Sequence, residues 1–228
     1  MEAGLQIFNE TGSIQIDSNY KNLALVAKYN VTPAVATVYN PGGTGQLYYA
    51  DIILGVAQPI VAARCAQECI AWQFLNASGQ QVVRVFSPRV VVEVFVFRVG
   101  ANSGAPYGVE VFNARGELTF SATAGYPRVI DAVQGNKSLP VFGGTYSFNS
   151  QGKKLAIITN SWGRQLTAMP GNSPGRYNIA RLGVCFRNLS ETQVRLTGYL
   201  LTTQFDASSA PPDYIREPSY ILVDVSNI

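Results

Sequence analysis

The chain of 228 residues contains no histidine and few charged residues. The absence of histidine excludes Ser-His-Asp and Cys-His catalytic sets and every metal site built on imidazole. Charged side chains make up only 14% of the residues, against about 25% in an average soluble protein. Much of the surface must therefore be uncharged or covered by another subunit.

Cysteine is also scarce, with Cys65, Cys69 and Cys185 only. An odd number without paired spacing argues against a disulfide framework, and the step from Cys65 to Cys69 is not that of a zinc pair. We interpret all three as buried thiols of a protein made in a reducing compartment.

Long apolar runs, phosphate-binding loops and paired acids are missing too. The longest apolar run, 90–99, contains two charged residues and is far shorter than the ~20 residues that span a bilayer. The start lacks the features of a signal peptide, the glycines at 42–45 are not followed by Lys and Ser/Thr, and the acids occur mostly singly, unlike a glycosidase pair. We expect cytoplasmic synthesis, no membrane insertion and no catalytic, cofactor or metal site, and hence no enzyme.

Positive charge gathers between residues 132 and 205, where the only acid is Glu191. The basic residues of this stretch are Lys137, Lys153, Lys154, Arg164, Arg176, Arg181, Arg187 and Arg195. They could meet an anionic partner such as lipopolysaccharide, nucleic acid or an acidic subunit. Because only Lys153 and Lys154 are adjacent and the others are widely spaced, we favour cations spread one per strand over several faces. We expect no nucleic-acid partner.

Nearly all of the chain alternates polar and apolar residues, or is rich in Val, Ile, Tyr, Phe and Thr between Gly, Pro and Asn breaks. This pattern is typical of strands. Only residues 60–70 could form either a short helix or a strand. The sequence predicts an all-β fold of antiparallel β-sandwich modules with little or no helix.

One pattern recurs four times between strand-like segments: a large apolar residue, Asn, two variable residues and Gly. The copies carry Asn9 and Gly12, Asn76 and Gly79, Asn113 and Gly116, and Asn149 and Gly152. Asn opens a tight turn by bonding the backbone ahead of it, and Gly takes the left-handed position of a hairpin bulge. We interpret all eight as structural turn residues rather than ligand contacts.

Two copies extend further, over residues 4–23 and 108–129, at an offset of 104 residues with a two-residue slip near the end. The Gly/Ser/Pro-containing segment 100–106 between them is a credible linker. We expect two related modules, 1–103 and 104–228; one larger sandwich is the alternative. A Pro-hinged terminal strand (211–228) could pair with a neighbouring subunit or fold back on its own module.

Aromatic residues are the remaining candidates for contacts. Tyr48, Tyr49, Trp72, Trp162 and Tyr177 could stack on sugars, because a flat ring matches the C–H face of a sugar. Trp72 reads as core. Trp162 lies in a loop-like stretch beside Arg164, so Trp162, Arg164 and Tyr177 are the possible surface contacts, with core or subunit-contact roles as the alternative.

The opening segment, Gly4-Leu-Gln-Ile-Phe-Asn-Glu-Thr-Gly-Ser-Ile-Gln-Ile-Asp-Ser-Asn-Tyr-Lys-Asn-Leu23, resembles the start of small tail-associated proteins of tailed bacteriophages and prophages. The second copy, residues 107–121, resembles segments that recur in the same proteins. The resemblance implies a virion structural protein of the distal tail, a tail-tip or tail-fibre component made in the host bacterial cytoplasm. It brings no catalytic residues.

We therefore expect a role in tail assembly, with host attachment as a further possibility. The expected partners are other phage tail proteins, further copies of the chain, and a host-surface glycan or lipopolysaccharide. Scarce charge favours a homo-oligomer, and a trimer is preferred because trimers are common in phage fibres. The alternatives are a carbohydrate-binding module and a capsule-directed depolymerase.

Overall fold

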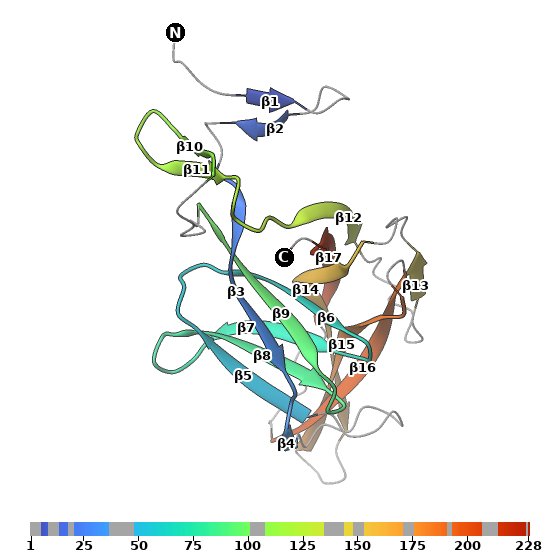
Figure 1. Ribbon diagram of the computed structural model, residues 1–228. Helices are drawn as coiled ribbons and strands as arrows, with labels where there is room; N and C mark the ends of the chain where they lie inside the picture. Colours follow the sequence, from blue (N-terminus) through green and yellow to red (C-terminus); the bar gives the residue numbers. More distant parts are fainter. Residues whose placement is uncertain are drawn as a thin grey trace.

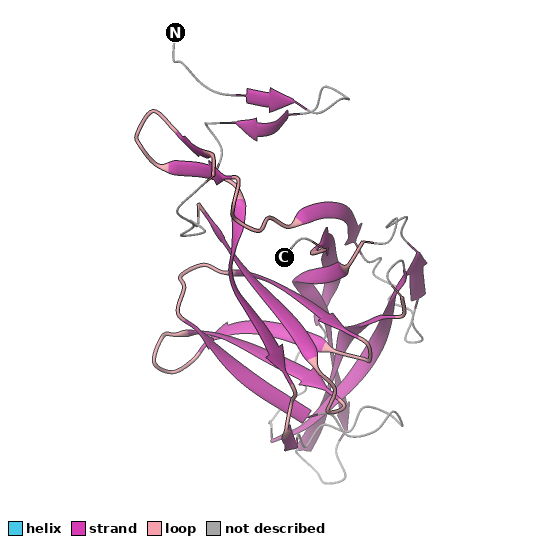
Figure 2. Ribbon diagram, viewed as in Figure 1, coloured by secondary structure: helices cyan, strands magenta, loops and turns pink. Residues whose placement is uncertain are grey.

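The computed structural model describes residues 6–8, 14–17, 21–36, 48–100, 108–134, 144–147, 153–170, 176–190, 193–206, 214–226 and 228. Within these ranges the chain is all-β: every regular element is a strand and every pairing is antiparallel (Figure 2). This confirms the fold class that the sequence predicted. No membrane-spanning helix occurs among the described residues.

Two short hairpins stand at one end of the molecule (Figure 1). The first consists of β1 (Gln6–Phe8) and β2 (Ile14–Asp17), and the second of β10 (Glu110–Phe112) and β11 (Leu118–Ser121). Their registers are identical at an offset of 104 residues, including a bulge after the second residue of β1 and of β10. The repeated sequence therefore forms the same local structure twice.

The remaining strands form two sheets. The four-stranded sheet has the order β4 (Val35–Ala36), β5 (Tyr48–Leu54), β8 (Gln81–Ser87) and β7 (Ile70–Leu75). The nine-stranded sheet contains β3 (Leu23–Val31), β6 (Ile60–Cys65), β9 (Val92–Val99), β12 (Arg128–Gln134), β13 (Gly144–Ser147), β14 (Leu155–Pro170), β15 (Arg176–Asn188), β16 (Gln193–Asp206) and β17 (Tyr214–Asp224). Residues 60–65 are thus a strand and not a helix.

Strands of the first half (residues 6–100) and of the second half (residues 108–228) pair in the same order. The first half contains the runs β3-β9-β6 and β5-β8-β7, and the second half contains β12-β17-β14 and β13-β16-β15. The antiparallel pair β6–β14 joins the halves. The order β3-β9-β6-β14-β17-β12 is therefore symmetric about a pseudo-two-fold axis between β6 and β14.

The registers agree as closely as the order. Leu25 pairs with Phe97 in the first half, and Val129 pairs with Val223 in the second. Val129 lies 104 residues after Leu25, and Val223 lies 126 residues after Phe97. Both edge strands, β3 and β12, then carry a one-residue bulge, at Val26 and at Ile130. The chain is an internal duplication in which the repeat extends from the hairpins into the sheet.

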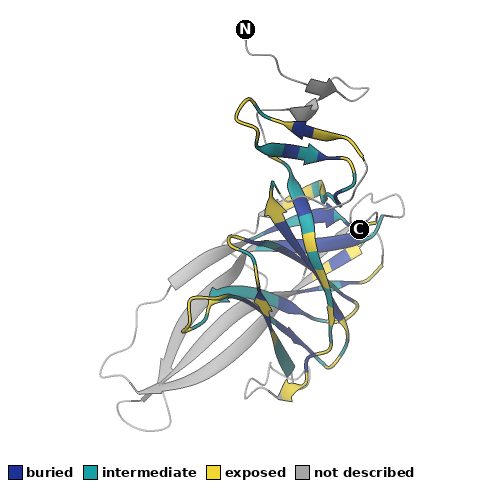
Figure 3. Cartoon of the chain, turned by 60° about the vertical axis from the view of Figure 1, so that its left-hand side comes forward, coloured by how far each residue is buried: buried dark blue, intermediate teal, exposed yellow. Residues whose placement is uncertain are grey.

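The two halves share one core. Residues from both line the space between the two sheets, among them Val94 of β9, Ile157 of β14 and Tyr220 of β17. The expected boundary at 103/104 separates the two sets of strands in the sequence. In space, however, both sets contribute to one nine-stranded sheet and to one core, as the single-sandwich alternative expects. Figure 3 shows the buried residues concentrated along the central strands.

The central strands are buried on both faces, which explains the long apolar run of β9. Val92, Val94 and Val96 face the core between the sheets, whereas Phe95 and Phe97 point to the opposite face and pack with Ala156 and Val223. Both phenylalanines are fully buried, and each contributes about 2–3 kcal/mol by removing its ring from water.

The terminal strand lies inside this sheet. β17 pairs with β12 on one side and β14 on the other, over the same residues 219–224. The terminal segment therefore folds back on its own chain, and the alternative of pairing with a neighbouring subunit is not what the structure shows. A central strand in the sheet is a poor candidate for a free exchange element.

Candidate functional site

Two of the four Asn-x-x-Gly loops lie among the described residues and share one geometry. The side-chain oxygen of Asn76 accepts hydrogen bonds from the backbone N–H groups of Ser78 and Gln80, at 3.0 and 2.9 Å. Gly79 donates to the carbonyl of Asn76 and has φ +75°. The left-handed position that the sequence predicted is therefore present in this hairpin.

The second described loop repeats these contacts. Asn113 accepts from the N–H groups of Arg115 and Glu117, both at 2.9 Å, and Gly116 has φ +73°. The amide of Asn113 also donates to the Glu117 carboxylate at 2.7 Å, and this bond, followed by one from Lys21, lowers the pKa of Glu117. Both described loops therefore close β-hairpins. Asn9, Gly12, Asn149 and Gly152 lie outside the described residues.

The three possible surface contacts lie in strands rather than in a loop. Trp162 and Arg164 belong to β14 and pair with Pro218 and Arg216 of β17. Tyr177 belongs to β15 and pairs with Phe205 of β16. The loop-like interpretation of residues 160–164 was therefore wrong, because β14 runs through Gly163 without a break. The side chains of these three residues lie outside the part of the chain that the structure describes.

The best-defined cluster of partly exposed aromatic groups lies instead on the outer face of the four-stranded sheet. Alternate residues of β5, β8 and β7 point away from the shared core, and the register aligns them in rows across the sheet. The aromatic face, as we call it, consists of Tyr49, Asp51, Trp72, Phe74, Arg84 and Phe86. It comes from the first half alone.

Arg84 organises this face. Its guanidinium donates two hydrogen bonds to Asp51 on the neighbouring strand, at 2.6 and 2.7 Å. The same guanidinium lies 4.4 Å from the ring centre of Tyr49 and 5.3 Å from that of Phe74. A guanidinium held between a carboxylate and two rings has little freedom, so the charged pair fixes the orientation of the rings around it.

The rings also contact one another. The ring of Trp72 is tilted by 52° against that of Phe74 at 5.6 Å, and Tyr49 is tilted against Phe86 at 6.2 Å. Phe86 is buried, whereas Tyr49, Trp72 and Phe74 remain partly exposed. Trp72, which the sequence predicted to lie in the core, is partly buried and packs against the small core cluster of Ile70 and Phe86.

This arrangement suits a flat ligand with both apolar and hydroxylated sides. Partly exposed rings offer apolar faces to the C–H side of a sugar. Arg84 and Asp51, each about one-third exposed, present a donor and an acceptor beside them. The alternation of side chains along the strand segments 49–53 and 70–74 could have indicated that these residues share one face of the sheet. The pairing of Arg84 with Asp51 could not be read without the register of β5 and β8.

A second charged cluster is structural. Glu93 accepts from Lys154 at 2.6 Å and from Arg64 at 3.0 Å, and Lys28 lies 3.9 Å away. Burial alone would raise the pKa of Glu93, but the hydrogen bonds and charges of Lys154 and Arg64 lower it overall. The cluster connects β3, β6, β9 and the start of β14, and so it ties the two halves together.

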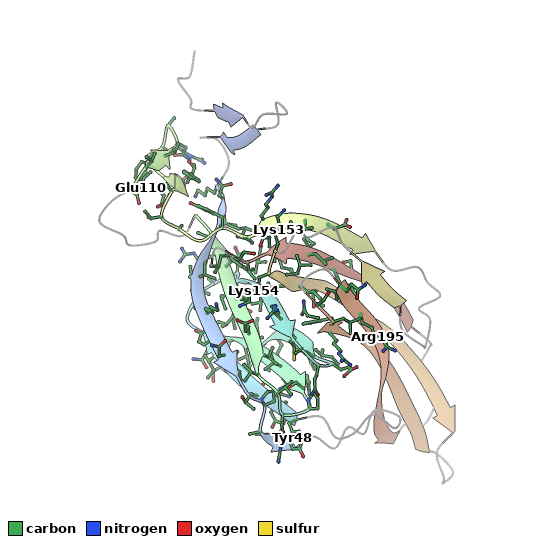
Figure 4. The ribbon with its side chains drawn as sticks, turned by 45° about the vertical axis from the view of Figure 1, so that its right-hand side comes forward. Tyr48, Glu110, Lys153, Lys154 and Arg195 are labelled. Carbon is green, nitrogen blue, oxygen red and sulfur yellow. The ribbon has the colours of Figure 1, made fainter. Side chains whose placement is uncertain are left out.

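The basic stretch 132–205 does not form one patch among its described side chains. Lys154 binds Glu93 and Arg187 lies 3.5 Å from Glu68. Figure 4 shows Arg195 on a different part of the molecule from Lys153 and Lys154. These side chains fit the interpretation of cations spread over several faces.

Two of the three cysteines lie in the core, as the sequence predicted for buried thiols. Cys65 and Cys69 are both buried, and a hydrogen bond from Cys69 lowers the pKa of Cys65 despite burial. The described residues contain no group of acids and cysteines that could hold a metal ion.

No protein-family model, curated protein or solved structure shows a significant match to the chain.

Proposed function

We propose that the protein is a structural and binding component of the distal tail of a bacteriophage, a tail-tip or tail-fibre protein, and that its aromatic face attaches to a glycan on the host surface. The observation that carries the proposal is the face itself, with rings fixed around a charged pair. The resemblance of residues 4–23 and 107–121 to tail-associated proteins supports the placement in the tail.

The chemistry supports binding rather than turnover. Arg84 and Asp51 satisfy one another through two short hydrogen bonds, so the carboxylate acts as a fixed acceptor beside the rings. Stacking on the rings supplies contact area for the glycan, and the charged pair supplies directional hydrogen bonds to it. Homo-oligomerisation, with a trimer preferred, and docking on other tail proteins belong to the same proposal.

The glycan role is tested with purified lipopolysaccharide and capsular polysaccharide of the host strain, by calorimetry with the full chain. Trp72→Ala removes one ring of the face, and about 1.4 kcal/mol of lost stacking corresponds to a tenfold weaker affinity. The matched control is Phe112→Ala, because Phe112 is 51% exposed on the β10–β11 hairpin, outside the aromatic face.

Unchanged binding by Trp72→Ala, or no binding of either polysaccharide by the full chain, would overturn the glycan role. Shortening of the polysaccharide during incubation would instead favour a depolymerase. Placement in the tail is tested separately, by labelling purified particles with antibodies to the chain. Particles that lack the chain would favour a free carbohydrate-binding module.

A further inference from the structure

The two halves differ at one place where the duplication predicts equivalence. In the first half, the start of edge strand β3 is covered by the hairpin of the second half. Asn22 donates its N–H to the carbonyl of Thr119 in β11, and Leu25 donates to the carbonyl of Gly125 just after it. Lys21 also lies 3.2 Å from Glu117. The β10–β11 hairpin thus docks on the preceding repeat.

The equivalent surface of the second half is open. Ala24 is 1% exposed and Leu25 is half-buried, whereas their counterparts Arg128 and Val129 in β12 are both exposed, Val129 by 62%. The difference does not come from strand pairing, because β3 and β12 share their register and bulge. Among the described residues, no hairpin covers the start of β12 as β10–β11 covers the start of β3.

We infer that this surface at the start of β12 binds the β1–β2 hairpin of a second copy of the chain, in the same way that β3 binds β10–β11. The occupant is argued from the duplication: β1–β2 has the sequence pattern, register and bulge of β10–β11. It is followed by the edge strand of its own repeat, as β10–β11 is. The contact does not depend on the aromatic face.

The duplication also gives the geometry of the contact. The N–H of Leu25 points away from β9 and toward Gly125, so the equivalent N–H of Val129 is directed toward the position of Lys21 in the second copy. A Cβ placed on Gly125 would lie 3.4 Å from the Cβ of Leu25. Lys21 and Val129 are the equivalents of these two residues, so their Cβ atoms would come equally close across the interface.

Such a contact joins different surfaces of the two copies. An interface of this kind is heterologous: it generates a ring when the rotation closes and a filament when it does not. Each copy has one β1–β2 hairpin and one β12 surface. An open chain of copies therefore always has one unbound hairpin at one end and one unbound β12 surface at the other. A closed ring of three would satisfy all surfaces and agree with the preferred trimer.

The first test is the mass of the full chain at tens of micromolar, by light scattering and sedimentation. Val129→Asp places a charge in the interface and should weaken self-association at least ~10-fold. The control is Val91→Asp, which alters an equally exposed valine (54%) between β8 and β9. A monomeric parent chain, or an oligomer unaffected by Val129→Asp, overturns the inference.

The second test is cross-linking. Cβ separations of about 3.5–4.5 Å fit a disulfide, so the double variant Lys21→Cys/Val129→Cys should form covalent oligomers under mild oxidation. Each single variant should yield no product beyond a dimer. Absence of covalent oligomers from the folded double variant overturns the geometry. Polysaccharide binding by Val129→Asp should remain unchanged, so failure here is separable from failure of the glycan role.

Discussion

The two halves of the molecule pair their strands in the same order and register but carry different residues at equivalent positions. On the outer side of the first half, Arg84 of β8 lies between Asp51 and Trp72. The hairpin after Leu75 and the turn after Asn188 are closed alike, by backbone bonds from Asn76 to Gln80 and from Leu189 to Gln193. This alignment gives Arg84 the counterpart Thr197 in β16.

The difference shows which features hold a β duplication together. Register depends on backbone pairing, turns and the inward-facing residues, because a slip of one position would turn every buried side chain outward. Outward-facing positions carry no such constraint and can change chemistry. The halves also differ in strand length: β14 has 16 residues where β6 has 6, and its extension pairs with β15.

The largest expected effect concerns the shared core. Phe97→Ala and Val223→Ala truncate equivalent residues of the two halves, both fully buried in one cluster. We expect Phe97→Ala to cost about 3–5 kcal/mol and both variants to shift one unfolding transition, measured by denaturant titration with circular dichroism and fluorescence. Two transitions, each shifted by only one variant, would show instead that the halves unfold independently.

The next effect concerns a charged residue that the second half lacks at the equivalent position. In the first half Glu93 of β9 pairs with Asn30 of β3, and in the second half Ser219 of β17 pairs with Gln134 of β12. These two pairs are equivalent, so Ser219 occupies the position of Glu93. Glu93→Gln should cost about 1.5–3 kcal/mol at pH 7, the value of hydrogen bonds to a charged group. The folded-state pKa of Glu93 is lowered, so its stabilisation is complete above the unfolded-state pKa of about 4.3 and is lost as the pH falls below it.

The measurement is the thermal midpoint of both proteins between pH 3 and pH 7. The midpoints should differ at pH 7 and converge at low pH, where the native carboxyl is protonated. A constant gap across this range would mean that Glu93 acts through packing and not through its charge. Ser219→Ala should give no comparable pH dependence.

A smaller and equal effect is expected at the two described turns. Gly79 and Gly116 have φ near +75°, and a Cβ at either position would meet no atom within 4 Å. Gly79→Val and Gly116→Val should therefore each cost about 1–2 kcal/mol through backbone strain alone. Gly55→Val is the control, because Gly55 has equal space without a positive φ. Unequal losses in thermal stability would weaken the equivalence of the hairpins.

Local chemistry explains how far the sequence could be interpreted. The turns at Asn76 and Asn113 were predictable because an Asn side chain and a left-handed Gly act within five residues. The β6–β14 pair was not, because Ala63 meets Ile157 from a distant part of the chain and apolar strands do not specify their partners. Trp162 was misplaced for a related reason, since Asn and Gly beside it suggest a loop that a long central strand overrides.

The smallest expected loss of stability concerns the outer face of the first half. Asp51→Asn removes the carboxylate that holds Arg84, and both side chains are about one-third exposed. Ion pairs at such positions contribute about 0.2–1 kcal/mol, so the thermal midpoint should hardly change. Polysaccharide affinity should fall more than stability does, because the guanidinium and the rings above it lose their fixed orientation. Thr197→Ala, at the equivalent place in the second half, should change neither quantity. A loss of stability without any loss of affinity in Asp51→Asn would assign the pair to folding and leave the aromatic face without its organising contact.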